Sequence, residues 1–146
     1  DDDIAVVMSH EIAHAIAGHG GERMSQQVLA QYGGAIAMEV LLAEQPAATK
    51  NLASLALGVG TQLGILAYSR KHENESDELG LYFMAMAGYD TYAGSKFWEK
   101  MSALSGGQQP PKLLSTHPPH GERIANLSRL APIAQQRFGP SSATGR

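Results

Sequence analysis

The chain has 146 residues, of which 43% are hydrophobic and 17% charged, a composition typical of one globular domain with a sizeable core. Its net charge of −3 argues against nucleic acid as a partner, because such partners require a basic surface. The absence of cysteine excludes disulfides, thiolate metal sites and thiol catalysis.

A first helix is predicted over residues 3–18, because apolar residues recur there at helical spacing. Three aspartates precede it, and acids stabilise a helix N-terminus. This start resembles a helix cut from a longer chain, so we expect a fragment that begins at this helix. The residues expected to face the core are Ile4, Val7, Met8, Ile12, Ala15 and Ile16.

This helix carries the pattern HExxH at residues 10–14. Residues four apart lie on one face of a helix, so His10 and His14 can present two nitrogens to one zinc ion. Glu11 lies one step round the helix, where it can act as a general base on a water molecule. A surface helix that carries these three residues by chance is the alternative for the pentapeptide alone.

Further helices are predicted in order along the chain, at residues 22–44, 49–68, 70–87, about 90–104 and around 123–130. No stretch alternates with the period of a strand, so the predicted fold class is mainly α. The residues of the second helix expected to face inward are Met24, Val28, Leu29, Ile36, Val40 and Leu41.

Residues 51–69 carry no charge and approach the length of a membrane span. Polar residues and three glycines dilute this run, which favours a buried core helix over a helix in contact with a membrane. Residues 105–111 are predicted to form a loop, and the domain is expected to cover residues 1–138, followed by a flexible tail at 139–146.

A catalytic zinc site needs a third protein ligand. The extended pattern HExxHxxGxxH fails, because Ala17 and Gly20 stand where it requires glycine and histidine. A glutamate from another helix is the other solution, and Glu73 is favoured among the glutamates because Asp77 lies four residues later on the same face. One carboxylate could bind the metal while the other holds a ligand histidine, although a charged, solvated helix face is the alternative.

Four segments occur in order along the chain, namely HEIAH, SRKHENESDELGL, FMAMAGYD and LSTHPPHGERIANL. Together they resemble the zinc metallopeptidase family of the CAAX prenyl protease and the bacterial envelope proteases HtpX, BepA and LoiP, which also has a mitochondrial inner-membrane relative. The resemblance covers residues 3–130. It implies a helical zincin-type core of about six helices, and that the family's small N-terminal β-sheet segment, which precedes HExxH, is missing from this chain.

The resemblance also implies one Zn²⁺ per chain, with Glu11 as the catalytic base that activates a zinc-bound water. Asp77 would support a ligand from behind. His117 matches a histidine that in some envelope members reaches the zinc and blocks the water position. The metal ligands that the resemblance implies are His10, His14 and Glu73.

The predicted function is that of a zinc-dependent endopeptidase that hydrolyses misfolded or envelope proteins in quality control. The resemblance favours the periplasmic side of the bacterial cell envelope and a polypeptide substrate. It is also compatible with membrane association, through upstream regions or a lipid anchor, and with an oligomer. Candidates for a donor that stabilises the transition state or contacts substrate are His117, Tyr68, His120 and Arg123.

A non-catalytic or latent module is the main alternative. In it, the metal would stabilise a helical domain that binds proteins, and His117 would close the fourth position as in a structural site. A weaker alternative is a membrane-embedded peptidase of prenylated proteins, which would require residues 51–69 to span lipid.

Overall fold

The computed structural model describes residues 1–104, 116–118 and 121–140, and the predicted loop at 105–111 and most of the predicted tail lie outside these ranges. None of the described residues forms a strand, which confirms the mainly α fold class. The chain divides into two compact units, one of Asp1–Ala17 with Glu73–Arg146 and one of Gly18–His72. A single domain over residues 1–138 stays a prediction.

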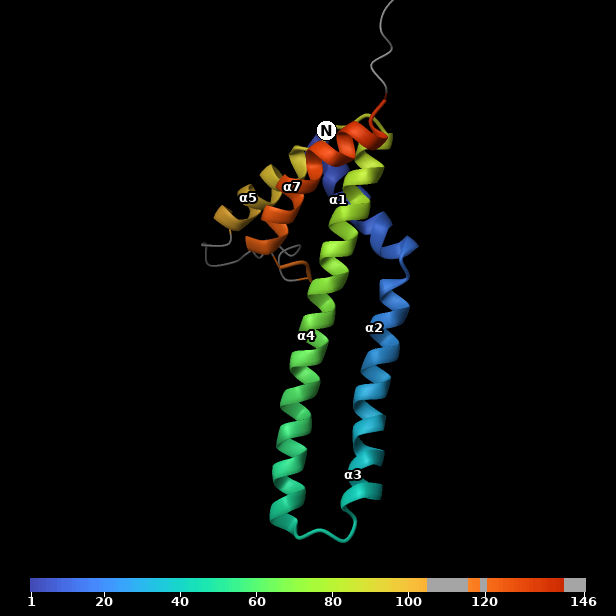
Figure 1. The fold of residues 1–146 in the computed structure, drawn as a ribbon, viewed down its shortest axis with the longest axis vertical. Helices are drawn as coiled ribbons and strands as arrows, with labels where there is room; N and C mark the ends of the chain where they lie inside the picture. Colours follow the sequence, from blue (N-terminus) through green and yellow to red (C-terminus); the bar gives the residue numbers. More distant parts are fainter. Residues whose placement is uncertain (105–115, 119–120, 141–146) are drawn as a thin grey trace, which may run out of the picture. The chain divides into compact units, whose positions relative to one another are not determined.

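The first unit is built from α1 (Asp2–Ile16), the last part of α4 (Ala47–Met86), α5 (Ala93–Leu104) and α7 (Gly121–Phe138). In Figure 1, α5 and α7 lie along each other, and α5 also packs against α1. The predicted helices at 90–104 and 123–130 are thereby confirmed. The buried hydrophobic core consists of Val6, Leu81, Met84, Ala85, Ala93, Phe97, Trp98, Leu127, Leu130 and Ala134.

The face of α1 that is buried differs from the prediction. Val6, Ser9, His10 and Ala13 are buried, whereas Ile4, Met8, Ile12 and Ile16 are 46% to 68% exposed. The physical reason is that the histidine-bearing side of α1 packs against α4. A Cβ added to Gly80 of α4 would meet Ser9 Oγ at 3.2 Å and the His10 backbone nitrogen at 3.3 Å, so the two helices approach closely beside His10.

Two helices are each followed by a glycine with positive φ. Gly18 follows α1 with φ 73° and Gly88 follows α4 with φ 80°, a conformation that glycine adopts without steric cost. After α4 the Tyr89 N–H donates to the Met84 carbonyl at 2.9 Å, which satisfies one of the helix's terminal carbonyls.

The second unit is a helical hairpin. Its first arm runs through α2 (His19–Val28), the π-helical turn η1 (Leu29–Gly33) and α3 (Gly34–Leu42), and its second arm is the first part of α4. Figure 1 shows these arms side by side, joined by residues 43–46. The predicted helices at 49–68 and 70–87 are one continuous helix, because no glycine or proline interrupts residues 65–79.

The apolar residues of the hairpin are exposed, contrary to the prediction. None of residues 51–69 is buried, so the expectation of a buried core helix is wrong. Within this unit, each arm has only the other arm to pack against. Among the described helices, α4 is long and apolar enough to cross a membrane. The predicted inward-facing residues of the first arm are 52% to 74% exposed, namely Met24, Val28, Leu29, Ile36, Val40 and Leu41.

Candidate metal centre

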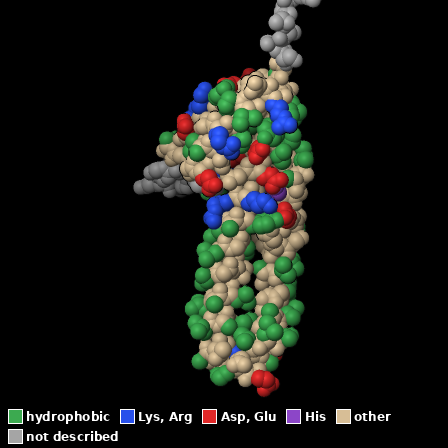
Figure 2. All heavy atoms as spheres, viewed as in Figure 1, with side chains coloured by type: hydrophobic (Ala, Val, Ile, Leu, Met, Phe, Trp, Pro, Cys, Tyr) green, Lys and Arg blue, Asp and Glu red, His purple; other side chains and the backbone are tan. Residues whose placement is uncertain are grey.

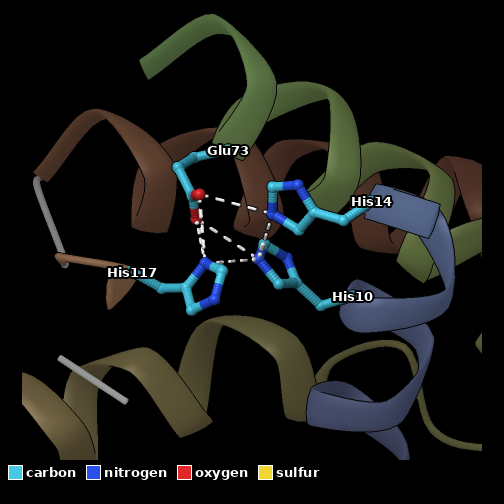
Figure 3. Close-up of side chains that lie close together, drawn as sticks. All are labelled: His10, His14, Glu73 and His117. Atoms are coloured by element: carbon cyan, nitrogen blue, oxygen red, sulfur yellow. Dashed lines mark hydrogen bonds and ion pairs between the residues drawn. The ribbon is translucent and has the colours of Figure 1, made fainter. Parts of the chain in front are cut away.

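Two helices of the first unit bring three of the predicted metal ligands together. His10 and His14 project from one face of α1, one turn apart, and Glu73 faces them from α4 (Figure 3). His10 Nε2 lies 3.1 Å from His14 Nε2 and 3.2 Å from Glu73 Oε2. His14 Nε2 lies 3.3 Å from Glu73 Oε1. The helical spacing in HExxH therefore produces the convergence expected of it.

His117, between α5 and α7, is the fourth side chain that offers an atom for metal binding. Its Nδ1 lies 2.9 Å from Glu73 Oε2 and 3.3 Å from His10 Nε2. Donor atoms of all four side chains lie within 4.8 Å of one another. Figure 3 shows the three imidazoles and the carboxylate directed at one point.

This donor set fits a tetrahedral divalent metal ion. Nitrogen and oxygen ligands about 2.0 to 2.1 Å from a tetrahedral zinc ion lie roughly 3.3 Å from one another. The contacts among the four donors that are given above run from 2.9 to 3.3 Å, close to that spacing. Imidazole nitrogens and a carboxylate oxygen are also ligands that zinc accepts, so the residues present suit the ion that the sequence predicted.

Asp77 contacts His10 through Nδ1, the ring nitrogen that does not face the other three side chains. Its Oδ1 is 2.9 Å from His10 Nδ1, a contact that favours a proton on Nδ1 and leaves Nε2 free to bind a metal. The same carboxylate is held by Arg123, which donates from Nε to Oδ2 at 2.7 Å and from Nη2 to Oδ1 at 2.8 Å. This bidentate pair fixes the orientation of Asp77 and, through it, of the His10 ring.

Arg123 is completely buried, which the sequence interpretation had not anticipated. Its Nη1 lies 3.1 Å from Glu73 Oε2, and its guanidinium carbon lies 4.0 Å from the centre of the Trp98 ring. The guanidinium is therefore enclosed by the ligand network and the core. One signal was available, because Arg123 shares its helix face with Leu127 and Leu130, four and seven residues later.

Burial and charge shift the pKa values of two of these side chains. Burial alone would lower the pKa of His10, but its contacts with the carboxylates of Asp77 and Glu73 raise that pKa above the ordinary value. Burial alone would raise the pKa of Glu73, but its contacts with three histidines and the nearby Arg123 charge hold it well below the usual range. Glu73 is therefore a carboxylate, as a metal ligand must be.

Glu11 lies at the edge of the cluster rather than inside it. Its Oε1 is 3.1 Å from His117 Nε2, and its side chain is 47% exposed. His117 thus contacts the ligands through one ring nitrogen and Glu11 through the other. Two other candidates for a transition-state donor cannot be placed at the site: Tyr68 belongs to the second unit, where its ring packs against His72, and His120 falls outside the described residues.

Residues 1–131 match the model of peptidase family M48. The chain is 37% identical to the human mitochondrial metalloendopeptidase OMA1 over 138 residues, which cover 90% of this chain and 26% of that protein. It is 34% identical to the mitochondrial metalloendopeptidase OMA1 of Schizosaccharomyces pombe, over 92% of this chain and 38% of that protein. No solved structure matches the chain significantly.

A bacterial relative is the β-barrel assembly-enhancing protease of Escherichia coli, 28% identical over 90% of this chain and 28% of that protein. The chain thus spans between about a quarter and two fifths of the length of these relatives. The predicted family is confirmed by a match over most of the chain that includes all four converging side chains. The chain belongs to peptidase family M48.

Proposed function

We propose that this chain contains the catalytic site of a zinc metalloendopeptidase, with His10, His14 and Glu73 holding the metal. The observation that carries the proposal is the convergence of these donors at tetrahedral spacing beside the carboxylate of Glu11. The names of the relatives, metalloendopeptidase and protease, support the same class of reaction. A bound zinc ion supplies Lewis acidity, which polarises a peptide carbonyl and makes water more acidic.

Glu11 would take the proton from the attacking water and pass it to the leaving amine. Its position suits this role, because it follows His10 on α1 and remains accessible to solvent. Asp77 would keep the His10 ring oriented, and Arg123 would hold the carboxylates of Asp77 and Glu73 in place. We assign Arg123 a positioning role, because its buried guanidinium is directed at those carboxylates.

His117 is proposed to hold the enzyme in a latent state. Its contacts with Glu73 and Glu11 support this, because a side chain there occupies the fourth donor position and engages the general base. The same geometry favours the second candidate, a metal-stabilised module without activity. Quality control of misfolded or envelope proteins, and a bacterial envelope location, stay predictions, since the relatives include mitochondrial proteins as well as bacterial ones.

The test compares zinc content and cleavage of unfolded casein, with and without a chelator. Glu11→Gln should retain zinc and lose cleavage, whereas Glu99→Gln, an exposed glutamate on α5, should retain both. Cleavage by the Glu11→Gln variant at the wild-type rate would contradict the proposed mechanism.

His117→Ala separates the two candidates. A latent peptidase should gain activity when His117 is removed, since the fourth donor position and Glu11 are both released. Loss of activity would instead assign His117 to the transition state. Absence of cleavage in both wild type and His117→Ala, with zinc retained, would favour the non-catalytic module.

A further inference from the structure

The outer sides of the hairpin of residues 18–72 are apolar and exposed. On the first arm one row of exposed residues consists of Leu29, Tyr32, Ile36 and Val40. On the second arm a similar row consists of Leu52, Leu55, Val59, Leu63 and Leu66. All are 51% to 71% exposed, and their spacing of three or four residues aligns them along one side of each helix. These two rows are here called the outer stripes. Figure 2 shows hydrophobic side chains along the outer edges of both arms.

The sides of the arms that face each other are more polar than the outer stripes. The space between them is lined by Gln27, Gln31, Ser54, Thr61 and Gln62, together with small and apolar residues. A hairpin stable in water places its leucines between the helices and its amides outside. In this hairpin the leucine rows lie outside, and five polar side chains lie among the small and apolar residues of the gap. Apolar rows on the outside are expected where the surroundings are themselves apolar.

Charged residues are confined to the two ends of the hairpin. None occurs at residues 24–38 or 51–69. The second of these runs has 19 residues, which span about 28 Å as a helix, close to the roughly 30 Å of bilayer hydrocarbon. The charged residues near the connecting loop are Glu39, Glu44 and Lys50, and those at the opposite end are Glu22, Arg23, Arg70 and Lys71.

The orientation of the stripes distinguishes a lipid from a protein partner. On each helix the outer stripe lies on the side opposite the residues that line the gap, so the two stripes point away from each other. A second hairpin packed on one flat side would leave at least one stripe in water, whereas lipid chains can surround both. We propose that the hairpin inserts into the hydrocarbon of a lipid bilayer, with the loop at 43–46 and its flanking charges at the far interface.

This proposal is independent of peptidase activity, and flotation of the 146-residue chain with vesicles of pure phosphatidylcholine tests it. Wild type should float with the vesicles, because apolar contact alone is required. Leu55→Glu with Leu63→Glu should reduce the bound fraction at least tenfold, because two carboxylates would enter hydrocarbon. Leu104→Glu is the matched control, since Leu104 is 60% exposed on α5 outside the hairpin and Leu63 is 62% exposed. Far-UV circular dichroism checks that all variants fold.

A second measurement does not depend on destabilising substitutions. The chain has no cysteine, so Leu63→Cys and Leu104→Cys each provide one site for an environment-sensitive fluorophore. Vesicles should shift the emission to the blue at residue 63 and leave it unchanged at residue 104. Equal shifts at both sites, or wild-type protein that stays at the bottom of the gradient, would overturn the proposal. A dimer in lipid-free solution that the stripe variant dissociates, without flotation, would assign the stripes to self-association and equally overturn it.

Discussion

Substitution of Asp77 by asparagine tests whether the contacts behind the ligands hold the metal centre together. Asparagine keeps the shape of the side chain but replaces one carboxylate oxygen by an NH₂ group. In one orientation this group faces the Arg123 Nε donor, and in the other it faces both Arg123 Nη2 and His10 Nδ1. Either way a donor meets a donor inside the protein, where water cannot relieve the conflict.

The expected magnitude follows from burial. Arg123 is fully buried and the Asp77 side chain is 5% exposed, so the substitution removes the carboxylate that pairs with this buried charge through two short contacts and leaves Glu73 as its remaining carboxylate contact. Breaking such a pair costs about 3–5 kcal/mol of unfolding free energy, a large share of the roughly 5–15 kcal/mol of a typical domain. Metal affinity should also fall about 10- to 100-fold, because the His10 ring loses the group that orients it.

Trp98 provides the assay, because it is the single tryptophan of the chain, is buried and lies against Arg123. Its fluorescence during urea unfolding measures the free-energy change, and competition with a chromogenic chelator measures affinity. Asp3→Asn is the control, since Asp3 and Lys100 form an exposed ion pair worth at most about 1 kcal/mol.

Removal of the Arg123 charge provides a second test of the Asp77–Arg123 pair. Arg123→Met should by itself lower the unfolding free energy, but Asp77→Asn combined with Arg123→Met should lower it by less than the sum of the two single losses, because the Asp77–Arg123 charge pair is then removed whole. If the two losses of unfolding free energy simply add, or if Asp77→Asn alone lowers the unfolding free energy by less than about 1 kcal/mol, the pair does not fix the site.

Three further outcomes are expected. Glu73→Ala should lose most bound zinc, and one equivalent of zinc per chain would reject Glu73 as a ligand. Gly80→Ala should destabilise the fold by about 1–3 kcal/mol, since its Cβ would press on α1 next to His10, whereas Gly58→Ala, with nothing within 4 Å, should be neutral or stabilising in urea unfolding. In the metal-free chain, the contacts that raise the His10 pKa stabilise the fold below pH 6.5, and this contribution should decline as pH rises through the raised value. An unfolding free energy, measured in urea, that does not change with pH above 6.5 would contradict this expectation.

Local spacing was sufficient to predict the parts of the site that lie within one helical turn. His10 with His14, and Glu73 with Asp77, each follow from the four-residue repeat of a helix. The position of His117 beside them was implied by resemblance rather than by spacing, because a long-range contact depends on how the helices pack. Arg123 was predicted as a possible transition-state or substrate contact, but its burial and its pairing with Asp77 were not predicted, because they too depend on how the helices pack.

In the hairpin, the helices were predicted but the surroundings of their apolar faces were predicted wrongly. Apolar residues at helical spacing predicted a buried face on the first arm, for instance at Ile36 and Val40, and that face is exposed. Periodicity identifies the side of a helix that avoids water, but it does not say whether protein or lipid covers that side. The boundary between the helices predicted at 49–68 and 70–87 failed because the polar stretch from Ser69 to Asn74 contains good helix formers and no breaker.

Arg123 contacts both Asp77 and the backbone beside His117, but the two sets of contacts differ in strength. It holds Asp77 at 2.7 and 2.8 Å with full charge, but it reaches the backbone carbonyls of His117 and Pro118 only at 3.4 and 3.3 Å. Long contacts to neutral carbonyls are weaker than short charge-assisted ones. Under the proposal that His117 blocks the site, its release would break its short contacts with Glu73 and Glu11 but only long contacts with Arg123, which would keep its short pair with Asp77.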